Sequence, residues 1–550
     1  MKGRIVQMLG IVVLTLLPSA FRANEAGHSP VKIAVDWGQT IGRLQTTPTV
    51  FVDPEPPGTP AHDAVFEALR NLTTRYIRYS PMPTPLRKSV AELQQPTKDK
   101  TFWDFSLMDA VTIPFLTMER GRDPIFSLSA PCAPAWMFES YDPALYAGRR
   151  VFTATQSADY DSFSDADFKA FESYRQLGPL SDPSGKQLAD YYARVVSWYV
   201  RGGFTDERGI YHRSGYHYSL PWLEVLNEVQ ADLTPQQYVT IYDAVVTAVR
   251  KVSPTTRFEG LALAPMGRLS GVPGPAREPA FFEFFLNPKN HRAGVPLDMV
   301  AYHFYAVPSL SATVDDWQYS IFDQADGFLN TVAFIESIRK RLSPSTRVNV
   351  DELGIILPND RVVVTAKETG ETAAALEIPP IYWNLSAAFY TYLYVELAKQ
   401  GIDVVTAAEL SVGNSKLYPS INLVEPKTGL PNARFRVLEL LNENFSPGDL
   451  LVSTQVESLS SGPPDLEVQA FANSTVKKIL IVNKRNAAVE VSVATVGQIN
   501  QLEVVDANTA SGPPRTRVTV GPTLGLAPFA VAVLSVAPSG RSGGEQRAPD

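Results

Sequence analysis

Residues 221–230, PWLEVLNEVQ, read as a short apolar strand that ends on Asn227-Glu228. Runs of this kind alternate with longer amphipathic stretches from about residue 60 to residue 440. The other β-like runs are RYIRYS (75–80), DPIFSLS (123–129), RFEGLALA (257–264), DMVAYHFYA (298–306), RVNVDELG (347–354) and IDVVTAAEL (402–410). Strand–helix alternation repeated this often favours a parallel sheet, and at this number a closed (β/α)8 TIM barrel. The first strand is ambiguous, because VKIAVDW (31–37) either begins the barrel or belongs to a neighbouring sheet.

The amphipathic stretches carry the signals of helix ends. TPQQYVTIYDAVVTAVRKV (234–252) starts with Thr234 as N-cap and Pro235 at the first helical position, which favours helix initiation. LADYYARVVSWYVRGG (188–203) ends on two glycines. These features predict helices between the strands, as the barrel requires.

The helical period disappears after about residue 440. Short β-like runs then follow one another, among them LEVQAFA, KKILIVNK and FAVAVLSVA, separated by clusters of Gly, Pro, Asn and Ser. This spacing predicts an antiparallel β-sandwich over residues 441–537. The catalytic barrel then covers residues 24–440, of which residues 24–60 either belong to it or pack on the sandwich. The polar, glycine-rich residues 538–550 are expected to form a disordered tail.

Composition and the N-terminal residues indicate where the protein works. The chain has 550 residues, 45% of them hydrophobic, and a formal net charge of −8, so it carries no general basic field for nucleic acid. Lys2 and Arg4 precede an apolar run (5–17) that is short for a membrane span. We expect a signal peptide over residues 1–23, with an uncleaved anchor as the alternative. The protein is therefore expected to be secreted and free of the membrane after signal removal, in an oligomeric state that the sequence does not indicate.

Cysteines, histidines and sequons give further limits. The single Cys132 excludes an intrachain disulfide, and we interpret it as a packing residue. The six histidines form neither H-x-H nor H-E-x-x-H, and no G-x-G-x-x-G follows a strand, so we expect neither a metal nor a nucleotide cofactor. Asn-x-Ser/Thr triplets at Asn71, Asn384, Asn444 and Asn473 are compatible with glycosylation, although chance accounts for one or two of them.

Two acidic strand ends suggest chemistry. Glu228 ends the run counted as the fourth barrel strand, and Asp351-Glu352 ends the seventh. The carboxyl ends of barrel strands form one cup, so Glu228 and Glu352 can face each other across a ligand. Retaining glycoside hydrolysis uses two carboxyl groups roughly 5 Å apart, one as nucleophile and one as proton donor. Either glutamate alone could be a solvated strand-end residue, but the pair, with Asn227 placed to bond a sugar hydroxyl, favours catalysis.

The pattern W-x-E-x-x-N-E on the fourth strand, with an acid ending the seventh, resembles that of clan A glycoside hydrolases. Short segments are also similar to family 39, which holds β-xylosidases and α-L-iduronidases. Besides the fourth strand they are TFWDFSLMDAVTIPFLTMERGRDPIFSLS (101–129), RFEGLALA, DMVAYHFYA and TGLPNARFRVLELLN (428–442). The resemblance covers residues 70–537 as architecture and implies that Glu228 is the acid/base and Glu352 the nucleophile. Leu226 and Val229 depart from the aromatic residue and the proline that the family has there.

Several residues are expected to support this pair. Clan members place an arginine on the second strand beside the nucleophile, and Arg78 matches it, where it would hold Glu352 ionised. A surface arginine is the alternative. His303 and Tyr305 share one face of the sixth strand and are expected to contact substrate, although a hydrogen-bonded core histidine is an equal interpretation. Trp136 is expected to line a subsite.

Three further residues and one loop complete the predictions from the sequence. Glu224 shares the parity of Glu228 and is expected to make a structural hydrogen bond to a neighbouring strand. Lys416 or Arg268 could hold the carboxylate of a uronic acid. The loop FTDERGIYHRSGYHYSLP (204–221) is expected to border the active site.

Together these features predict a secreted, retaining and exo-acting glycoside hydrolase with a carbohydrate as its partner. By the resemblance, its substrate is a xyloside or a uronide. One alternative is a barrel that binds glycans without cleaving them. Another is a clan A enzyme of a different family, such as a β-glucuronidase or an arabinofuranosidase. Neither is excluded by the residues themselves.

Overall fold

The structure is a computed structural model. It describes residues 29–53, 60–81, 91–92, 94–119, 121–128, 133–139, 179–264, 278–309, 313–357, 378–411, 419–425, 428–457, 465–494, 498–509, 511–518, 521 and 523–537. The expected signal peptide (1–23), the expected tail (538–550), Cys132, Arg268 and Lys416 lie outside the described residues.

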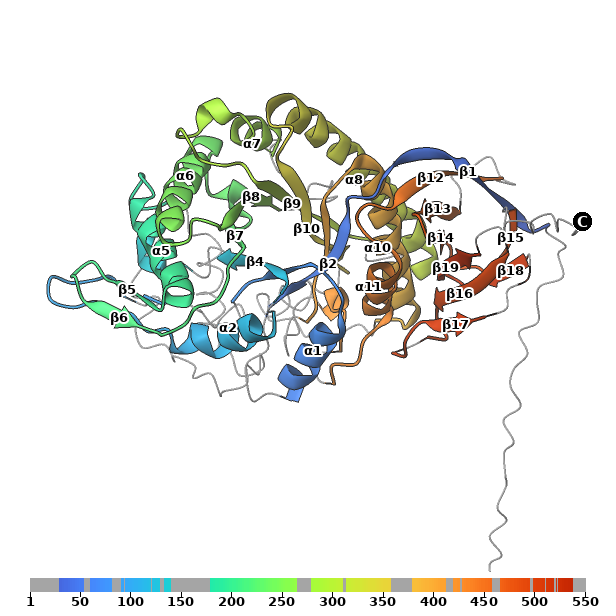
Figure 1. The fold of residues 1–550 in the computed structure, drawn as a ribbon, viewed down its shortest axis with the longest axis horizontal. Coiled ribbons are helices and arrows are strands. Elements are labelled where there is room, and N and C mark those ends of the chain that lie inside the picture. The colour runs from blue at the N-terminus through green and yellow to red at the C-terminus, as the bar shows by residue number, and fades with distance from the viewer. Residues whose placement is uncertain are drawn as a thin grey trace, which may run out of the picture.

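Eight parallel strands close into a barrel in the order β10-β11-β2-β3-β4-β7-β8-β9 (Figure 1). Their bounds are β2 Thr47–Val52, β3 Tyr76–Tyr79, β4 Asp123–Leu128, β7 Trp222–Val225, β8 Arg257–Leu263, β9 Met299–Ala306, β10 Arg347–Ile355 and β11 Val404–Ala407. Each strand pairs in parallel with the strand that follows it in the chain, and β11 closes the ring on β2. The predicted (β/α)8 barrel is confirmed, and β7 and β10 are its fourth and seventh strands.

Helices surround the barrel (Figure 1). Their bounds are α1 Pro60–Asn71, α2 Ser106–Met118, α5 Lys186–Val200, α6 Pro235–Val252, α7 Glu278–Phe285, α8 Val314–Leu342, α10 Ile381–Gln400 and α11 Ala433–Asn444, with short 3-10 turns at η2 Ala135–Met137, η4 Val229–Ala231, η5 Pro288–Asn290 and η6 Pro419–Ile421. As predicted, Thr234 caps α6 in a capping box with Gln237, and Pro235 is its first residue. α5 ends just before Gly202, whose φ of +82° favours glycine. None of the described helices is both long and apolar enough to span a bilayer.

The barrel interior is layered. Near the amino ends of the strands, Tyr76, Ile125, Trp222, Met299 and Val404 form a small apolar cluster. Toward the carboxyl ends the interior residues become charged, as described below. An apolar floor under a charged layer means that the acids of the upper layer have little water beneath them.

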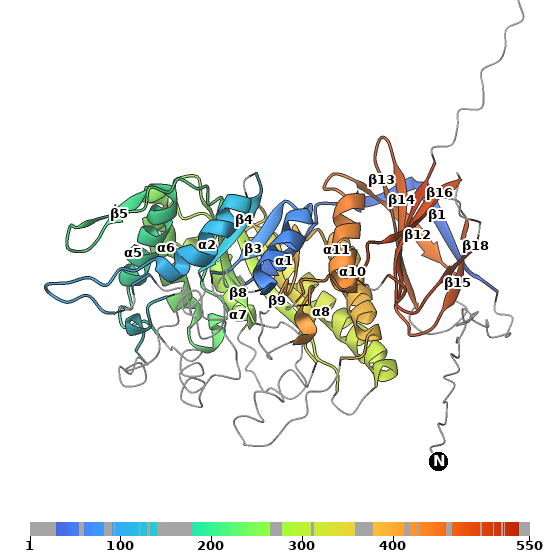
Figure 2. The same cartoon turned by 90° about the horizontal axis from the view of Figure 1, so that it is seen from below.

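Beyond the barrel, nine strands form one curled sheet in the order β17-β16-β19-β14-β13-β12-β1-β15-β18 (Figure 2). The strands are β1 Val31–Arg43, β12 Leu450–Val456, β13 Leu466–Ala472, β14 Lys477–Asn483, β15 Val489–Ala494, β16 Ile499–Val505, β17 Arg515–Arg517, β18 Thr523–Leu526 and β19 Val531–Val536. All its pairings are antiparallel except that of β1 with β15. The sheet encloses its own hydrophobic core. The run 31–37 therefore belongs to this neighbouring sheet, and β2 is the first barrel strand.

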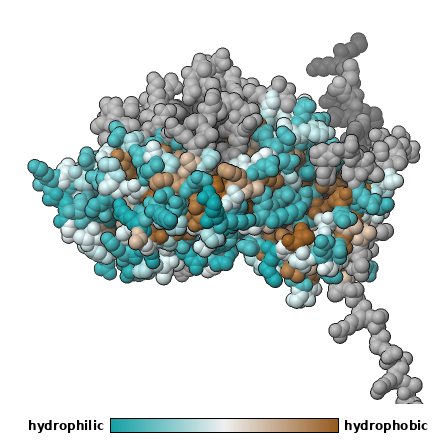
Figure 3. All heavy atoms as spheres, turned by 90° about the horizontal axis from the view of Figure 1, so that it is seen from above, coloured by the Kyte–Doolittle hydropathy of each residue, from teal (hydrophilic) through white to brown (hydrophobic). Residues whose placement is uncertain are grey.

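The outer face of this sheet packs on the barrel helices. Phe471, Leu480 and Val531 share one hydrophobic cluster with residues of α10 and α11. The rings of Phe445 and Phe471 lie 4.2 Å apart, and Lys399 on α10 forms an ion pair of 2.8 Å with a glutamate of β13. On the face drawn in Figure 3, the described surface is mainly hydrophilic, with hydrophobic residues in small patches. Small scattered patches are normal on a folded domain.

The structure corrects one prediction about the loop 204–221. This segment includes the hairpin of β5 Gly203–Thr205 and β6 Tyr211–Arg213, and it leads from α5 into the amino end of β7. Its last residues hydrogen-bond to the start of β8: Thr256 donates to the carbonyl of Leu220, and the amide of Arg257 donates to that of Pro221. Residues 214–221 therefore lie on the amino side of the barrel, because a helix-to-strand connection must end where the next strand begins. For these residues the prediction that the loop borders the active site is wrong. The hairpin contacts the segment before α2, where Thr101 donates to Asp206 and Arg208 donates to the carbonyl of Thr97.

Two sequons are buried. Asn384 on α10 is 5% exposed and Asn444 on α11 is 8% exposed. The Asn444 amide donates to the carbonyl of Leu440, and its oxygen accepts from Lys478. A glycan on either asparagine would have to occupy space that the core fills, so the folded chain has no room for one there.

Candidate active site

Arg78 on β3 is the centre of a buried charge network. It is 1% exposed. Its guanidinium donates twice to Glu224 (2.7 and 2.8 Å) and once each to Glu352 and Asn227 (both 2.7 Å), and Asp351 lies 3.4 Å away. Burial alone would lower the pKa of Arg78, but the neighbouring carboxylates Glu224, Asp351 and Glu352 outweigh it and raise that pKa well above its ordinary value. The prediction that Arg78 contacts Glu352 is confirmed.

The adjacent acids Asp351 and Glu352 both reach the barrel interior because β10 is irregular at this point. The pairing of β10 with β9 shifts between Val350 and Glu352. In a regular strand two successive side chains point to opposite faces, whereas the extra residue of a β-bulge lets both turn to one side. Asp351 is fully buried and Glu352 is 8% exposed. The bulge therefore places two acids beside one arginine.

Glu228 lies just beyond β7 in a backbone conformation that few side chains adopt. Its φ is +53°, and that of Leu226, two residues earlier, is +61°. Such left-handed residues cost free energy and persist where the surroundings enforce them, often at functional sites. The amide of Glu228 donates to the carbonyl of Ala262 at 2.9 Å, which ties this turn to β8. The side chain of Glu228 is left 35% exposed, so it can meet a ligand.

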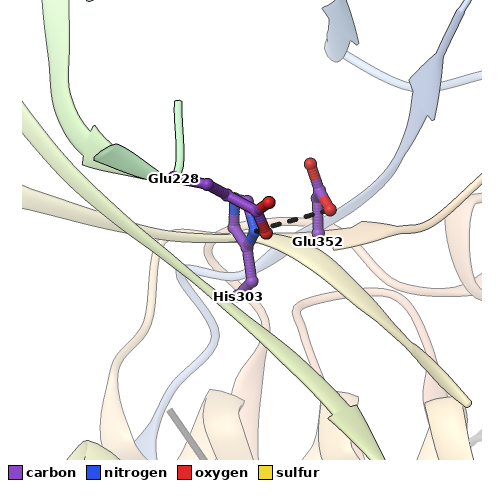
Figure 4. Close-up of side chains that lie close together, drawn as sticks. All are labelled: Glu228, His303 and Glu352. Atoms are coloured by element: carbon purple, nitrogen blue, oxygen red, sulfur yellow. Dashed lines mark hydrogen bonds and ion pairs between the residues drawn. The ribbon is translucent and has the colours of Figure 1, made fainter. Parts of the chain in front are cut away.

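His303 and Tyr305 on β9 connect the two glutamates. His303 Nδ1 lies 2.9 Å from Glu228 Oε1 and 3.4 Å from Glu352 Oε2, and the Tyr305 hydroxyl donates to Glu352 at 2.8 Å. Ligand-type atoms of Glu228, His303 and Glu352 all lie within 4.8 Å of one another, and Figure 4 shows how these side chains converge. The spacing of the two carboxyl groups matches that of retaining glycosidases, about 5 Å, rather than the wider gap of inverting ones.

The protonation of His303 follows from its neighbours. Burial lowers its pKa, but the charges of Glu352 and Asp351 and the hydrogen bonds to Asp351 and Glu228 outweigh burial and raise the pKa well above its ordinary value. His303 is fully buried. It is therefore an imidazolium at neutral pH, donating toward Glu228 on one side and toward Asp351, 3.4 Å away, on the other.

Below this level lies a second cluster of acids. Oxygens of Glu224, Glu259 and Asp351 lie within 4.8 Å of one another, and all three residues are fully buried. Glu224 accepts from Arg78 and from Ser127 on β4, which confirms the structural hydrogen bond predicted for it. Burial and the charges of Asp351 and Glu224 raise the pKa of Glu259 well above its ordinary value, so Glu259 holds a proton.

Two groups of side chains lie close enough together to ligate a metal ion: an upper trio of Glu228, His303 and Glu352, and a lower trio of Glu224, Glu259 and Asp351. Hydrogen bonds and ion pairs already engage the upper trio, through Arg78, Tyr305 and the histidine itself. The guanidinium of Arg78 lies against two of the three acids of the lower trio. Cations of the protein and protons thus balance these carboxylates, and the donor set does not resemble an open metal site.

The two remaining candidate residues, Asn227 and Trp136, have different surroundings. Asn227 Oδ1 accepts a hydrogen bond from Arg78, which also donates to Glu352. Trp136 instead donates its indole N–H to the backbone oxygen of Glu92 at 3.3 Å and packs against the barrel core. Trp136 is partly buried, and its role in a subsite stays a prediction.

Sequence reasoning did not single out Glu259, Asp53 or Glu409. Glu259 is in RFEGLALA, where nothing distinguishes a buried acid from an exposed one. Asp53 directly follows β2, and Glu409 is the second residue after β11, so both lie at the carboxyl ends of barrel strands. Applying the strand-end rule to every strand would have found both of them.

No protein-family model matches the chain. No curated protein matches it either. Solved structures of similar architecture do exist. An α-L-arabinofuranosidase from Thermotoga maritima, in complex with arabinose, aligns with a TM-score of 0.56 at 14% identity over 92% of this chain and 99% of its own.

Two other structures give the same result. A glucosidase from Croceicoccus marinus aligns with a TM-score of 0.54 at 13% identity, over 93% of this chain and 100% of its own. CelM2, a bifunctional glucanase-xylanase from a metagenome library, aligns with a TM-score of 0.55 at 13% identity, over 92% of this chain and 99% of its own. At such identities the likeness concerns the fold. This chain therefore has the fold of glycosidases in which a TIM barrel is joined to a β-sandwich.

Proposed function

We propose that this chain is a retaining glycoside hydrolase with Glu352 as nucleophile and Glu228 as acid/base. The observation that carries the proposal is the approach of one carboxyl oxygen of Glu228 to within 4.8 Å of one of Glu352, at the carboxyl ends of β7 and β10. In the first step a Glu352 oxygen bonds to the anomeric carbon while the bond to the leaving oxygen breaks, and Glu228 protonates that oxygen. In the second step Glu228 takes a proton from water, the water oxygen bonds to the anomeric carbon, and Glu352 is released.

The surroundings of the two glutamates suit these different roles. Glu352 is nearly buried, and each of its oxygens accepts a hydrogen bond, one from Arg78 and one from Tyr305. Donors on both oxygens stabilise a carboxylate and orient it for attack. The side chain of Glu228 is more exposed, and its Oε1 lies 2.9 Å from His303 Nδ1, so its carboxyl group is oriented and accessible to the leaving oxygen. Two carboxyl groups in unlike environments are what an acid and a nucleophile require.

We propose further that the enzyme is secreted and exo-acting, on a carbohydrate whose terminal sugar is xyloside- or uronide-like. The short apolar run near the N-terminus supports secretion. The resemblance to family 39 supports this choice of substrate.

The test is hydrolysis of aryl xylosides, arabinofuranosides, glucosides and glucuronides by the parent and by Glu352→Gln, Glu228→Gln and a matched control. Glu457→Gln serves as control, because its side chain is 67% exposed in the β-sandwich. Glu352→Gln should lose activity by roughly 10⁴-fold. Glu228→Gln should lose roughly 10²- to 10⁴-fold on alkyl or phenyl glycosides, and far less on dinitrophenyl glycosides, whose leaving group needs no proton.

NMR of the first product should show the anomeric configuration of the substrate. A parent that binds these sugars without turnover, or a Glu352→Gln variant as active as the parent, would refute the proposal. A product of inverted anomeric configuration would refute only the nucleophilic role of Glu352, and not the hydrolase activity.

A further inference from the structure

Two more acids meet at the barrel mouth. Asp53 directly follows β2, and Glu409 follows β11, the strand that pairs with β2. The amide of Leu410 donates to the carbonyl of Phe51 at 2.9 Å, which keeps the two strand ends together. The carboxyl groups of Asp53 and Glu409 hydrogen-bond to each other. They come from opposite ends of the barrel sequence, so only ring closure brings them together.

This acid pair faces the catalytic glutamates. Phe51 points inward, because its ring lies 4.3 Å from the guanidinium of Arg78, whereas Val52 belongs to the hydrophobic cluster outside the barrel. By strand alternation Asp53 points inward again, one layer nearer the mouth than Phe51. Ala408, the residue before Glu409, packs against Tyr305, which donates to Glu352.

The turn that carries Glu409 is held rigidly. The amide of Glu409 donates to the carbonyl of Ile421 at 2.8 Å. Arg434, which is 2% exposed, donates to the carbonyls of Ala408 and Ile421 on either side of it. Side chains that position a ligand need such support.

The protonation of the pair gives it both kinds of hydrogen-bonding group. Glu409 is 5% exposed, and its burial, together with the nearby charges of Asp53 and Glu352, raises its pKa well above the ordinary value. Burial and these charges favour the protonated form of Glu409, whose carboxyl group can then donate one hydrogen bond and accept another. Among the described residues, Glu409 Oε1 is buried and accepts no hydrogen bond. A sugar hydroxyl, which both donates and accepts, matches this arrangement.

The cations near the pair are already engaged. Arg78 donates to Glu224, Glu352 and Asn227. His303 faces Glu228 and Asp351, and Arg434 donates to backbone carbonyls. In the part of the chain that the structure describes, the field beside the nucleophile is therefore negative, and a second carboxylate brought there would meet repulsion.

We propose that Asp53 and Glu409 bind hydroxyl groups of the sugar ring whose bond is cleaved, and that they select a neutral sugar over a uronic acid. This inference rests on the proposed function and narrows its substrate from xyloside or uronide to the neutral class. Arg434, which is buried and bound to carbonyls, then serves to position Glu409.

The first test compares two aryl glycosides that differ only in one group, the β-D-glucoside and the β-D-glucuronide, with the β-D-xyloside beside them. The parent should show a kcat/KM at least about tenfold higher on a neutral substrate than on the glucuronide. Asp53→Asn and Glu409→Gln should each raise KM for the neutral substrate by about tenfold or more, since they remove one member of a hydroxyl-binding pair. Asp465→Asn, a 58% exposed aspartate of the β-sandwich, is the matched control and should change nothing.

A second measurement needs no variant. Calorimetric titration of the parent with D-xylose, D-glucose and D-glucuronate should detect binding of a neutral sugar and no binding of glucuronate over the same concentration range. Preference of the parent for the glucuronide, or unchanged KM in both folded variants, would overturn the inference while leaving a working hydrolase. Failure of the proposed function looks different, because the parent would then turn over no glycoside at all.

Discussion

Replacing Arg78 with methionine should destabilise the barrel far more than an ordinary loss of charge. Methionine keeps an apolar stem of similar reach but removes the guanidinium, which is 1% exposed and donates four hydrogen bonds of 2.7–2.8 Å. Glu224, Asp351 and Glu352 would then face one another without a cation between them. Breaking a buried ion pair by removing one partner costs about 3–5 kcal/mol. This is a large fraction of the 5–15 kcal/mol or so that stabilises a typical domain.

The assay is unfolding in urea and by heat, followed by tryptophan fluorescence. For a barrel of this size we expect a fall in Tm of about 5 °C. Arg75→Met is the control: Arg75 also pairs with an acid, Asp123 at 2.7 Å, but its side chain is 62% exposed. An exposed pair of this kind contributes less than about 1 kcal/mol.

A double-mutant cycle decides whether unpaired charge is the cause. Adding Glu224→Met to Arg78→Met removes the carboxylate that received two of the four hydrogen bonds, so the second change should cost much less than Glu224→Met does in the parent. We expect a coupling energy near 2 kcal/mol between the two sites. Additive effects within about 0.5 kcal/mol would refute the reasoning, because they would show that Arg78 and Glu224 stabilise the barrel independently.

Three further outcomes follow from single positions. Its acidic neighbours raise the pKa of His303, so the charge of His303 stabilises the folded state below pH 6.5. This contribution is lost as the pH rises through the higher pKa of the folded state. The difference in unfolding free energy between the parent and His303→Gln, measured in urea titrations, should therefore shrink from pH 6 to pH 9.5. Burial and the carboxyl group of Glu207 raise the pKa of Glu92 to about 9, so Glu92→Gln should gain stability relative to the parent as pH rises toward 9, and a constant difference in Tm would contradict this. A Cβ on Gly260 would come within 2.5 Å of a ring carbon, so Gly260→Ala should cost about 1–3 kcal/mol of unfolding free energy, whereas Gly525→Ala, with no atom within 4 Å, should cost far less.

Much of the fold could be predicted from the sequence because its signals are local. Alternation of apolar runs with amphipathic stretches indicates a barrel, whichever residues form the loops that connect them. The cap Thr234-Pro235 marks the start of α6. Strand β1 could not be assigned, because an amphipathic run of this kind pairs equally well with a barrel strand or with a sandwich strand. Its hydrogen bonds to β12 and β15 settle the choice, and those partners lie more than 400 residues further along the chain.

Part of the candidate site could likewise be predicted from the sequence, and part of it could not. Glu228, Glu352 and Arg78 could be predicted, because strand ends and one buried cation in an apolar run are visible in the sequence. The bulge that turns both Asp351 and Glu352 inward was not, since it depends on the register with β9. The aromatic composition of the loop 204–221 predicts a wall of the active site, but the position of the loop before a strand takes its last residues to the amino end of β7.

The sequence by itself determined which carboxylates stand at the ends of which strands. It did so because the order of strands around a barrel follows the order of the chain, so that strand counting places residues on the rim. Only the tertiary structure decided how those carboxylates are charged. The pKa of an acid depends on burial and on charges within a few ångströms, and Arg78, His303 and Asp53 reach Glu224, Glu228 and Glu409 across sequence separations of up to several hundred residues. Protonation, and with it the proposed division into acid, nucleophile and hydroxyl-binding groups, therefore depends on the closure of the ring.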